Sequence, residues 1–560
     1  MRNTTTILVF FALLAGAPGA EAALGDHRWS QGWNAGGFAS PDDTGHIAAA
    51  GTFFGAVDFG GGTFTPANIF GGDVFLARFD ASGNHVWSRQ ITPGGFGFSV
   101  NAVTAAPDGS IYLAGTLLQN GDIDLGGGLL SGSNKTVLAG FEPDGSHRFS
   151  FIAGDGRVQK LVASNTTVAC TGYTSGSIDF GGGTLTSAGG TDVFLGVLEA
   201  DGSHRFSRVF GDAGAQGGMG LALDPAGGVV LAAGAESTID FGGGVLTAAG
   251  GDLCLAAFDA SGVHQWSWSR TGTFTSGSGI LFTLDVAVSG TGDIAVGGLF
   301  RNTTDLGGGM LTSNGSGDVF VARYDANGSH LSSLTFGGNA TDGVFGVSFD
   351  GDGNLAIAGT FLSSSVDFGG GPLTLAATFG SDWFLAVFDG SNSLLHSASY
   401  TGDGQYSILP RFDPSGRLLL YGSGGGNTDF GGGTLATTGF FLAQLDGTST
   451  PTGPGSASDL AVGKSGADLL LSWGSDCGLG DAYGIYRGDL AMGYGSLAAD
   501  SCDLATTQAT IPMGVPDGEF FLVVPAWNAQ EGSYGPAGAG DRASVPGACH
   551  LQGTVDQCAP

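Results

Sequence analysis

Glutamate and lysine, which build the exposed faces of most soluble helices, are nearly absent from this chain. Its 560 residues include six Glu and three Lys, and only 12% of the residues are charged. This shortage excludes an all-α fold. Beyond the N-terminus, no apolar stretch approaches the ~18 residues of a membrane-spanning helix, so we expect a protein that is not embedded in a membrane.

Basic residues are scarce as well. The chain has 18 Lys and Arg against 50 Asp and Glu, which gives a formal net charge of −32. Nucleic acids and anionic membranes are bound by clustered Lys and Arg, so we expect neither partner. Most of the acidic residues are Asp, and Asp beside Gly is typical of turns. We therefore interpret the acidity as turn chemistry and solubility, with binding of divalent cations or a saline habitat as the alternatives.

The first 22 residues predict a secretory signal peptide. Arg2 supplies a positive charge, residues 7–15 are mostly apolar, and Ala20-Glu21-Ala22 is a small-x-small cleavage site. We therefore expect the mature chain to be secreted, in the periplasm or outside the cell, where disulfides can persist.

A repeated motif organises most of the chain. The string Asp-(Phe/Leu)-Gly-Gly-Gly begins at Asp58, Asp124, Asp179, Asp240, Asp305, Asp367 and Asp429. Around each copy, apolar segments of period two are separated by Asp-Gly or Ser-Gly turns, which predicts a four-stranded antiparallel meander of strands a, b, c and d. One such sheet cannot cover both its faces, whereas seven sheets packed around an axis can. The sequence therefore predicts an all-β fold containing a seven-bladed β-propeller.

The two ends of the repeat region complete each other. Strand d carries the pattern His-x-aromatic-Ser, as at residues 85–88, and in the fifth and sixth copies only a His and a Ser remain, around His330 and His396. The seventh unit stops after residues 440–446 and lacks strand d, but residues 27–31 read His-Arg-Trp-Ser-Gln. We predict that 27–31 pair with 440–446 and close the ring without a free sheet edge.

The clearest repeat is residues 73–88, Asp-Val-Phe-Leu-Ala-Arg-Phe-Asp-Ala-Ser-Gly-Asn-His-Val-Trp-Ser. It resembles the bacterial SBBP-type seven-bladed β-propeller repeats, and the resemblance covers about residues 25–447. It implies a propeller domain over residues 23–447. Because propellers host many unrelated activities, it implies no particular function.

A second region follows a Pro/Gly/Ser linker at residues 448–457. Residues 458–548 contain strand-like segments, with Trp473 on an early one, and their order resembles a fibronectin type III domain, which implies a small β-sandwich. Residues 549–560 are expected to form a C-terminal tail. Four cysteines lie in this part of the chain, Cys477, Cys502, Cys549 and Cys558. They allow three disulfide pairings, of which we favour 477–502 and 549–558.

Side chains that often carry chemistry fall on structural positions of the repeat. Histidines at strand d are spread around the ring, so we expect packing or hydrogen bonding from them and no catalytic set. They are His27, His85, His147, His204, His264, His330 and His396. Cys170 and Cys254 lie within strands of the third and fourth units and are expected to be buried free thiols. No residue is assigned a catalytic or cofactor-binding role.

Two sets of residues remain as candidate ligand sites. The b–c loops that carry the motif leave the ring on the same face as the d–a connections, and binding usually resides in loops on a rigid scaffold. The Asp that begins each motif is therefore a candidate binding-face residue; the structural alternative is that Asp caps the glycine turn while Phe or Leu plugs between blades. Asp350, Asp352 and Asn354 offer closely spaced oxygens that suit calcium, with an ordinary a–b turn as the alternative.

These features predict an exported, non-catalytic recognition or surface-associated module that binds an extracellular protein or glycan. Two alternatives remain open. One is a propeller hydrolase or lyase acting on extracellular polysaccharide, with carboxylates of the loop face as acid and base. It requires two carboxylates in one blade's loops that the other blades lack, and the sequence reveals no such pair. The other is a calcium-stabilised adhesin.

Overall fold

Strands are the only regular elements in the described part of the chain. The computed structural model describes residues 24–447, apart from positions 69, 249, 273, 275–283, 377–379, 402–406, 425–427 and 436–438, and beyond residue 457 it describes strands only. A helix able to span a membrane is absent from these residues. The chain divides into two compact units, Leu24–Thr448 and a second that contains Ser449–Pro560. The all-β prediction is confirmed.

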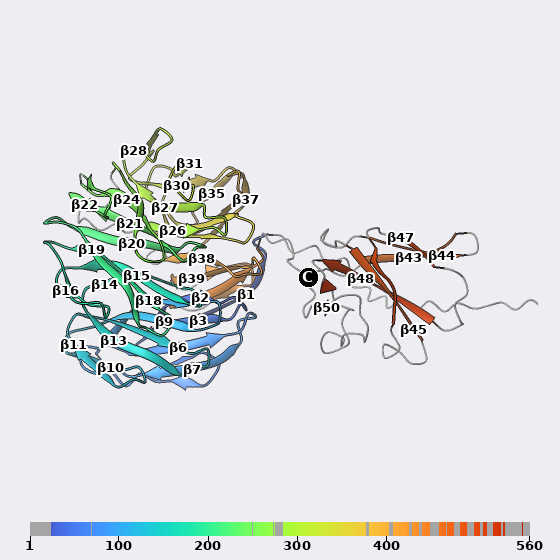
Figure 1. Cartoon of the computed structure of the whole chain (residues 1–560), viewed down its shortest axis with the longest axis horizontal. Coiled ribbons are helices and arrows are strands. Elements are labelled where there is room, and N and C mark those ends of the chain that lie inside the picture. The colour runs from blue at the N-terminus through green and yellow to red at the C-terminus, as the bar shows by residue number, and fades with distance from the viewer. Residues whose placement is uncertain are drawn as a thin grey trace, which may run out of the picture. The chain divides into compact units, whose positions relative to one another are not determined.

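The first unit consists of antiparallel four-stranded sheets arranged as the blades of a propeller (Figure 1). Over the described residues there are seven blades, numbered here 1 to 7 from the blade that begins with β2. Strand a is the inner strand, because the a strands of neighbouring blades lie against one another around the ring, and strand d is the outer one. The predicted seven-bladed propeller is confirmed.

The strands take the following bounds in blades 1 to 7. Strand a is β2 (Gly36–Pro41), β8 (Phe98–Ala105), β14 (Arg157–Ala163), β20 (Gln216–Leu223), β26 (Leu284–Val288), β32 (Asp342–Phe349) and β38 (Ile408–Phe412). Strand b is β3 (Ile47–Phe53), β9 (Ile111–Leu117), β15 (Thr167–Thr174), β21 (Val229–Ala235), β27 (Ile294–Phe300), β33 (Leu355–Phe361) and β39 (Leu418–Gly424). Strand c is β6 (Asp73–Phe79), β12 (Lys135–Phe141), β18 (Asp192–Glu199), β24 (Asp252–Phe258), β30 (Asp318–Tyr324), β36 (Asp382–Phe388) and β42 (Gly439–Leu445). Strand d is β7 (His85–Ile91), β13 (His147–Asp155), β19 (His204–Phe210), β25 (His264–Arg270), β31 (His330–Phe336), β37 (Leu394–Tyr400) and β1 (His27–Trp33).

Each copy of the repeated motif forms a small hairpin between strands b and c. The hairpins are β4 (Val57–Asp58) with β5 (Thr63–Phe64), β10 (Gly121–Asp124) with β11 (Leu129–Gly132), β16 (Ser177–Ile178) with β17 (Leu185–Thr186), β22 (Thr238–Asp240) with β23 (Val245–Thr247), β28 (Thr303–Asp305) with β29 (Met310–Thr312), β34 (Ser365–Asp367) with β35 (Pro372–Thr374), and β40 (Thr428–Asp429) with β41 (Thr434–Leu435). Several lie at the periphery of the propeller in Figure 1, among them β10, β11, β16, β22 and β28. Six of these hairpins form separate two-stranded sheets, whereas β16 pairs with β13 at one position and so extends the sheet of blade 2.

The N-terminal strand closes the ring. Strand β1 pairs antiparallel with β42 over most of its length, from His27 opposite Leu445 to Trp33 opposite Phe440. The pairing is continued by a hydrogen bond from Gly25 N to Asp446 O at 2.8 Å, and Arg28 Nη1 donates to Asp446 Oδ1 at 2.5 Å. The predicted pairing of residues 27–31 with 440–446 is confirmed, so the last blade is made from both ends of the repeat region.

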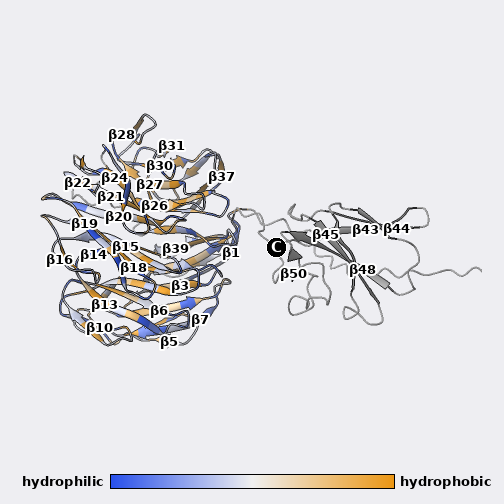
Figure 2. Cartoon of the chain, viewed as in Figure 1, coloured by the Kyte–Doolittle hydropathy of each residue, from blue (hydrophilic) through white to orange (hydrophobic). Residues whose placement is uncertain are grey.

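The hydrophobic core lies between the blades. Each buried cluster combines side chains of two adjacent sheets, as where Leu195 and Val197 of β18 pack with Leu231 and Ala233 of β21. Figure 2 shows apolar segments recurring from blade to blade. Ala and Gly are frequent on strand b, which runs through the middle of the sheets, and these small residues allow the sheets to approach. The clusters follow one another around the ring, so each blade is stabilised by two neighbours.

The second unit contains two small sheets. One has the order β43 (Ser458–Ser465), β44 (Asp468–Gly474) and β47 (Gln508–Ile511). The other has the order β46 (Ala498–Leu504), β45 (Ala482–Asp489), β48 (Glu519–Trp527), β49 (Gln530–Glu531) and β50 (Leu551–Gln552). The fibronectin type III likeness stays a prediction. The predicted signal peptide at 1–22 and the linker at 448–457 lie outside the described residues, and so do the side chains of Cys477, Cys502, Cys549 and Cys558.

Removing the Trp33 side chain should weaken the closing blade selectively. The ring centroid of Trp33 lies 5.8 Å from that of Phe440, 5.5 Å from that of Phe59 and 5.1 Å from that of Phe79. Because Trp33→Ala removes these contacts, we expect the free energy of unfolding to fall by about 3–5 kcal/mol. The matched control is Phe210→Ala, at the equivalent end of strand d in blade 3, where no chain end is released.

Hydrogen–deuterium exchange separates the two variants. In Trp33→Ala, the amides of β1 and β42 should exchange faster than those of every other blade, whereas in Phe210→Ala strands β18 and β19 should keep most of their protection. Equal loss of protection in the two variants would show that β1 is held no differently from an internal strand.

Candidate functional site

The Asp residues of the repeated motif hold their own hairpins. In all seven, the Asp Oδ1 accepts hydrogen bonds from the backbone N–H groups two and four residues further on, as Asp58 does from Gly60 N at 2.7 Å and Gly62 N at 3.1 Å. The φ angles of Gly60 and Gly62 are 107° and 118°, which other residues rarely adopt. One oxygen of each carboxylate is therefore used inside its own loop, and binding by these residues stays a prediction.

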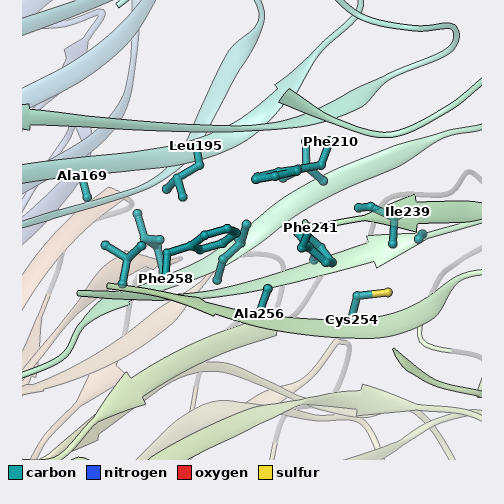
Figure 3. Packing of buried hydrophobic residues seen from close by; sticks show 14 of the residues in the cluster. Ala169, Leu195, Phe210, Ile239, Phe241, Cys254, Ala256 and Phe258 are labelled. Carbon is teal, nitrogen blue, oxygen red and sulfur yellow. The ribbon is translucent and has the colours of Figure 1, made fainter. Parts of the chain in front are cut away.

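The residue after this Asp packs between adjacent blades. All seven are buried: Phe59, Leu125, Phe180, Phe241, Leu306, Phe368 and Phe430. The ring centroid of Phe241 lies 5.0 Å from that of Phe210, the last residue of strand d in the preceding blade. Figure 3 shows Phe241 beside Ile239 and Phe258. Phe368 is placed in the same way. Its ring centroid lies 4.8 Å from that of Phe336 in the preceding blade and 4.8 Å from that of Phe384 in its own blade. The predicted inter-blade plug is confirmed.

The strand-d histidines cover the glycine hairpins. His85 Nε2 forms a hydrogen bond of 2.9 Å with Ser88 Oγ, and its ring lies so close to Gly61 that an added Cβ there would be 2.4 Å from His85 Cε1. The same contacts recur at His27, His147, His204, His264 and His330. The placement of His396 in this set is wrong. Leu394 takes the position beside Gly370, and His396 lies two residues further along β37.

The turn at residues 350–354 is held by its own side chains. Asp350 Oδ1 accepts from Asp352 N at 3.0 Å and Asn354 N at 2.8 Å, and Asp350 Oδ2 accepts from Asn354 Nδ2 at 2.8 Å. Asp80 and Asn84 make the same bonds in a c–d turn of blade 1. Burial raises the pKa of Asp350 above its usual value. These contacts suit the turn interpretation, and calcium stays a prediction.

Metal and thiol chemistry find little support among the described residues. There, no three His, Cys, Asp or Glu side chains are grouped so that they could hold a metal ion. Cys170 and Cys254 are buried free cysteines, as predicted, and burial raises the pKa of both thiols to about 12. Thiols with such pKa values are not nucleophiles at neutral pH.

Three exposed phenylalanines gather on blade 1, where repeat analysis gave no signal. Phe54, Phe70 and Phe96 keep 71%, 75% and 53% of their surface exposed. The rings of Phe70 and Phe96 lie 6.3 Å apart, and a Cβ added to Gly72 would lie 2.9 Å from the ring of Phe54. We call these three residues the Phe platform. Phe54 and Phe70 belong to the b–c loop, and Phe96 belongs to the d–a connection to blade 2.

Polar contacts tie the two segments of the Phe platform together. Asn68 Oδ1 accepts from Phe70 N at 2.9 Å and Gly71 N at 3.0 Å, while Asn68 Nδ2 donates to Pro93 O at 2.8 Å. The buried Asp73 carboxylate accepts from Thr92 Oγ1 at 2.6 Å. Burial acts to raise the pKa of Asp73, but its hydrogen bonds prevail and hold that pKa below the usual value. The loop is therefore held in place although it carries exposed rings.

The Phe platform breaks the symmetry of the propeller. Phe54 is the first residue after strand b. In blades 2 to 6 that position holds Leu118, Ser175, Glu236, Arg301 and Leu362. Sequence comparison of the repeats could have found this difference, but only if the loops had been compared position by position instead of by their shared motif.

A charged group inside the ring was also missed. Lys160 of β14, Asp285 of β26 and Arg411 of β38 meet although they come from blades 3, 5 and 7. Lys160 Nζ lies 2.5 Å from Asp285 Oδ1, and Arg411 Nη1 lies 3.7 Å from Asp285 Oδ2. We call these three residues the axial cluster. Contacts that skip a blade can be made only across the inside of the ring.

Comparison with known proteins bears on the fold alone. No protein-family model and no curated protein matches the chain. Among solved structures, the WD40 domain of Toxoplasma gondii coronin is similar at 10% identity and a TM-score of 0.38, over 77% of this chain and 90% of that chain. Rhamnogalacturonan lyase YesW is similar at 13% identity and a TM-score of 0.27, over 79% and 81%. The class defined by the fold is a seven-bladed β-propeller; membership of the SBBP group stays a prediction.

In the repeated motif, the buried Phe or Leu should contribute more to the free energy of unfolding than the Asp that caps the hairpin. Phe241→Ala should lower the free energy of unfolding by about 3–5 kcal/mol because it leaves a cavity between two blades. Asp240→Ala should cost about 1 kcal/mol, since it removes two hydrogen bonds at an exposed loop. Urea denaturation measures both, with the exposed Val245→Ala as the control. A cost for Asp240→Ala above that of Phe241→Ala would contradict the inter-blade role.

Chelation tests calcium at the Asp350 turn. Because the turn is held by its own hydrogen bonds, we expect the thermal midpoint of the purified chain to be the same with and without EDTA. Asp350→Asn should lower the midpoint by the same amount in both conditions. A midpoint that drops by several degrees in EDTA for the unaltered chain, and not for Asp350→Asn, would establish a calcium site there.

Proposed function

We propose that the chain is an exported, non-catalytic recognition module that binds an extracellular glycan through the Phe platform. The N-terminal 22 residues support export. Large exposed aromatic rings on loops held by hydrogen bonds support binding, because a large exposed apolar patch is typical of an interaction site. The single observation that carries the proposal is the pair of exposed rings Phe70 and Phe96, whose centroids lie 6.3 Å apart, with the exposed Phe54 against Gly72 of the same loop.

The size of the Phe platform favours a small ligand. A phenylalanine side chain offers on the order of 200 Å², so three rings exposed by 71%, 75% and 53% present about 400 Å². A standard protein–protein interface buries about 800 Å² on each partner. The rings therefore suit the apolar faces of a few sugar units better than a whole protein surface.

The charge of the chain favours a neutral glycan. With a formal net charge of −32, the chain repels anionic partners at long range. Uncharged sugar rings are not repelled in this way, and their C–H faces can stack on phenylalanine rings. The backbone carbonyl oxygens of Pro93 and Gly95 lie beside the rings and accept hydrogen bonds from Asn68 Nδ2. The rim of the Phe platform is therefore polar.

A glycan array on the purified chain tests this proposal. We expect a set of neutral oligosaccharides to bind the unaltered chain and to lose at least tenfold in affinity for the triple variant Phe54→Ala, Phe70→Ala and Phe96→Ala. The matched control is the triple variant Leu129→Ala, Val245→Ala and Met310→Ala, since these hairpin side chains are 66%, 67% and 69% exposed but not aromatic.

Three outcomes would overturn the proposal. One is equal binding by both triple variants. The second is binding only to matrix proteins on a parallel array, which would make the module a protein-binding one. The third is release of reducing ends or unsaturated products from a labelled polysaccharide, which would establish the hydrolase or lyase alternative.

A further inference from the structure

The axial cluster occupies positions that are apolar or small in other blades. In each blade, one residue of strand a pairs with the residue that precedes a strand-b glycine. In blades 1 to 7 these residues are Phe38, Ala102, Lys160, Gly218, Asp285, Gly346 and Leu409. Packing of the repeat therefore requires no charge at this level of the ring. Lys160 and Asp285 are exceptions, and Arg411 joins them from two residues beyond Leu409.

The cluster contains one more cation than it needs for an ion pair. Asp285 is bound by Lys160 Nζ at 2.5 Å and by the backbone N–H groups of Val286 and Val347 at 2.9 and 3.2 Å, with Arg411 further away at 3.7 Å. The chain has only 18 Lys and Arg in all. Placing two of them beside one carboxylate leaves a local charge of +1 inside a strongly acidic protein.

Arg411 has donors to spare. Its Nη1 donates to Pro410 O at 2.8 Å and to Val347 O at 3.3 Å, whereas no partner among the described residues accepts from its Nε or Nη2. Its side chain keeps 23% of its surface exposed, against 13% for Lys160 and 2% for Asp285. Part of the Arg411 side chain is therefore reached by solvent, and its Nε–Nη2 edge has the fork geometry that binds a carboxylate through two parallel hydrogen bonds.

The local electrostatics reflect two cations that share one carboxylate. Burial, with the charge of Arg411, lowers the pKa of Lys160 to about 8, although Asp285 acts in the opposite direction. Tyr421 of β39 also faces the cluster, and burial raises its pKa, so its hydroxyl is neutral at pH 7. Burial acts to lower the pKa of Arg411, but Tyr421 and Asp285 act to raise it and outweigh the effect of burial, so Arg411 stays charged. A buried ion pair is often no more stabilising than apolar residues of similar size. Stability alone does not account for the second cation.

We propose that the axial cluster binds a small carboxylate-bearing molecule, with the Nε–Nη2 edge of Arg411 as the fork, Lys160 as the second cation and Asp285 as the internal carboxylate with which the ligand competes for the two cations. A monoanion brings the cluster to neutrality, whereas a dianionic phosphate or sulfate would leave it at −1 beside Asp285. The site lies on the inner strands of the ring and is separate in its residues from the Phe platform, so it does not depend on the proposed function.

Isothermal titration calorimetry with glucuronate at pH 7 tests the site. Glucose serves as the uncharged analogue and sulfate as the dianion, and we expect heat from glucuronate alone. Arg411→Gln and Lys160→Met should each weaken glucuronate binding at least tenfold. Lys135→Met is the matched control, since Lys135 also forms a 2.5 Å ion pair, with Asp155, but at the surface. The thermal midpoint of each variant shows whether it is folded.

Two further readouts distinguish a binding site from a purely structural ion network. Asp285→Asn removes the competing internal carboxylate, so it should bind glucuronate several-fold more tightly, whereas loss of a structural network would only lower the midpoint. At pH 8.5, a bound carboxylate should raise the pKa of Lys160, which then takes up a proton from the buffer, so the binding enthalpy should vary with the ionisation enthalpy of the buffer. Absence of glucuronate heat with the unaltered chain, or equal affinity in Arg411→Gln, would overturn the proposal.

Discussion

The pairing of β1 with β42 is the contact on which the rest of the propeller depends. Each blade is covered by its two neighbours, so an open ring would expose one face of blade 7 and one face of blade 1. The N-terminal strand supplies the missing strand d and places Trp33 against Phe440 of its own blade and Phe59 of the next. One seven-residue strand thereby covers the outer edge of β42 and completes the last inter-blade core.

The composition of the chain follows from how its loops are held. Asp carboxylates accept backbone N–H groups in the glycine hairpins, in the turns between strands and at the start of strand c, where Asp73, Asp192 and Asp318 are buried. A carboxylate held by amides needs no cation as its partner. The chain can therefore hold many Gly-rich loops in place with few Lys and Arg. Its net charge is strongly negative as a consequence.

The repeat made the architecture predictable, and it also limited what could be predicted. Seven copies of one motif, with an orphan strand d near residue 27, were enough to predict the blades, the closure and the inter-blade plug. The same reliance on the repeat placed His396 in a set to which Leu394 belongs by position. Lys160 and Asp285 are 125 residues apart and meet only across the closed ring, so no local pattern could have joined them. The Phe platform depends on a loop conformation that shared motifs do not encode.

Function in a repeat protein is best sought where a blade departs from its neighbours. A feature present in all seven blades, such as the Asp-capped hairpin, is explained by what each blade needs in order to fold. The Phe platform and the axial cluster have no such explanation, since Phe54 is replaced by residues as different as Ser175 and Arg301, and Lys160 by Ala102 and Gly346. The exposed aromatic rings lie on one blade, and the buried cations come from only three of the seven. Because these features are not shared by all the blades, they are the places where we propose contact with a ligand.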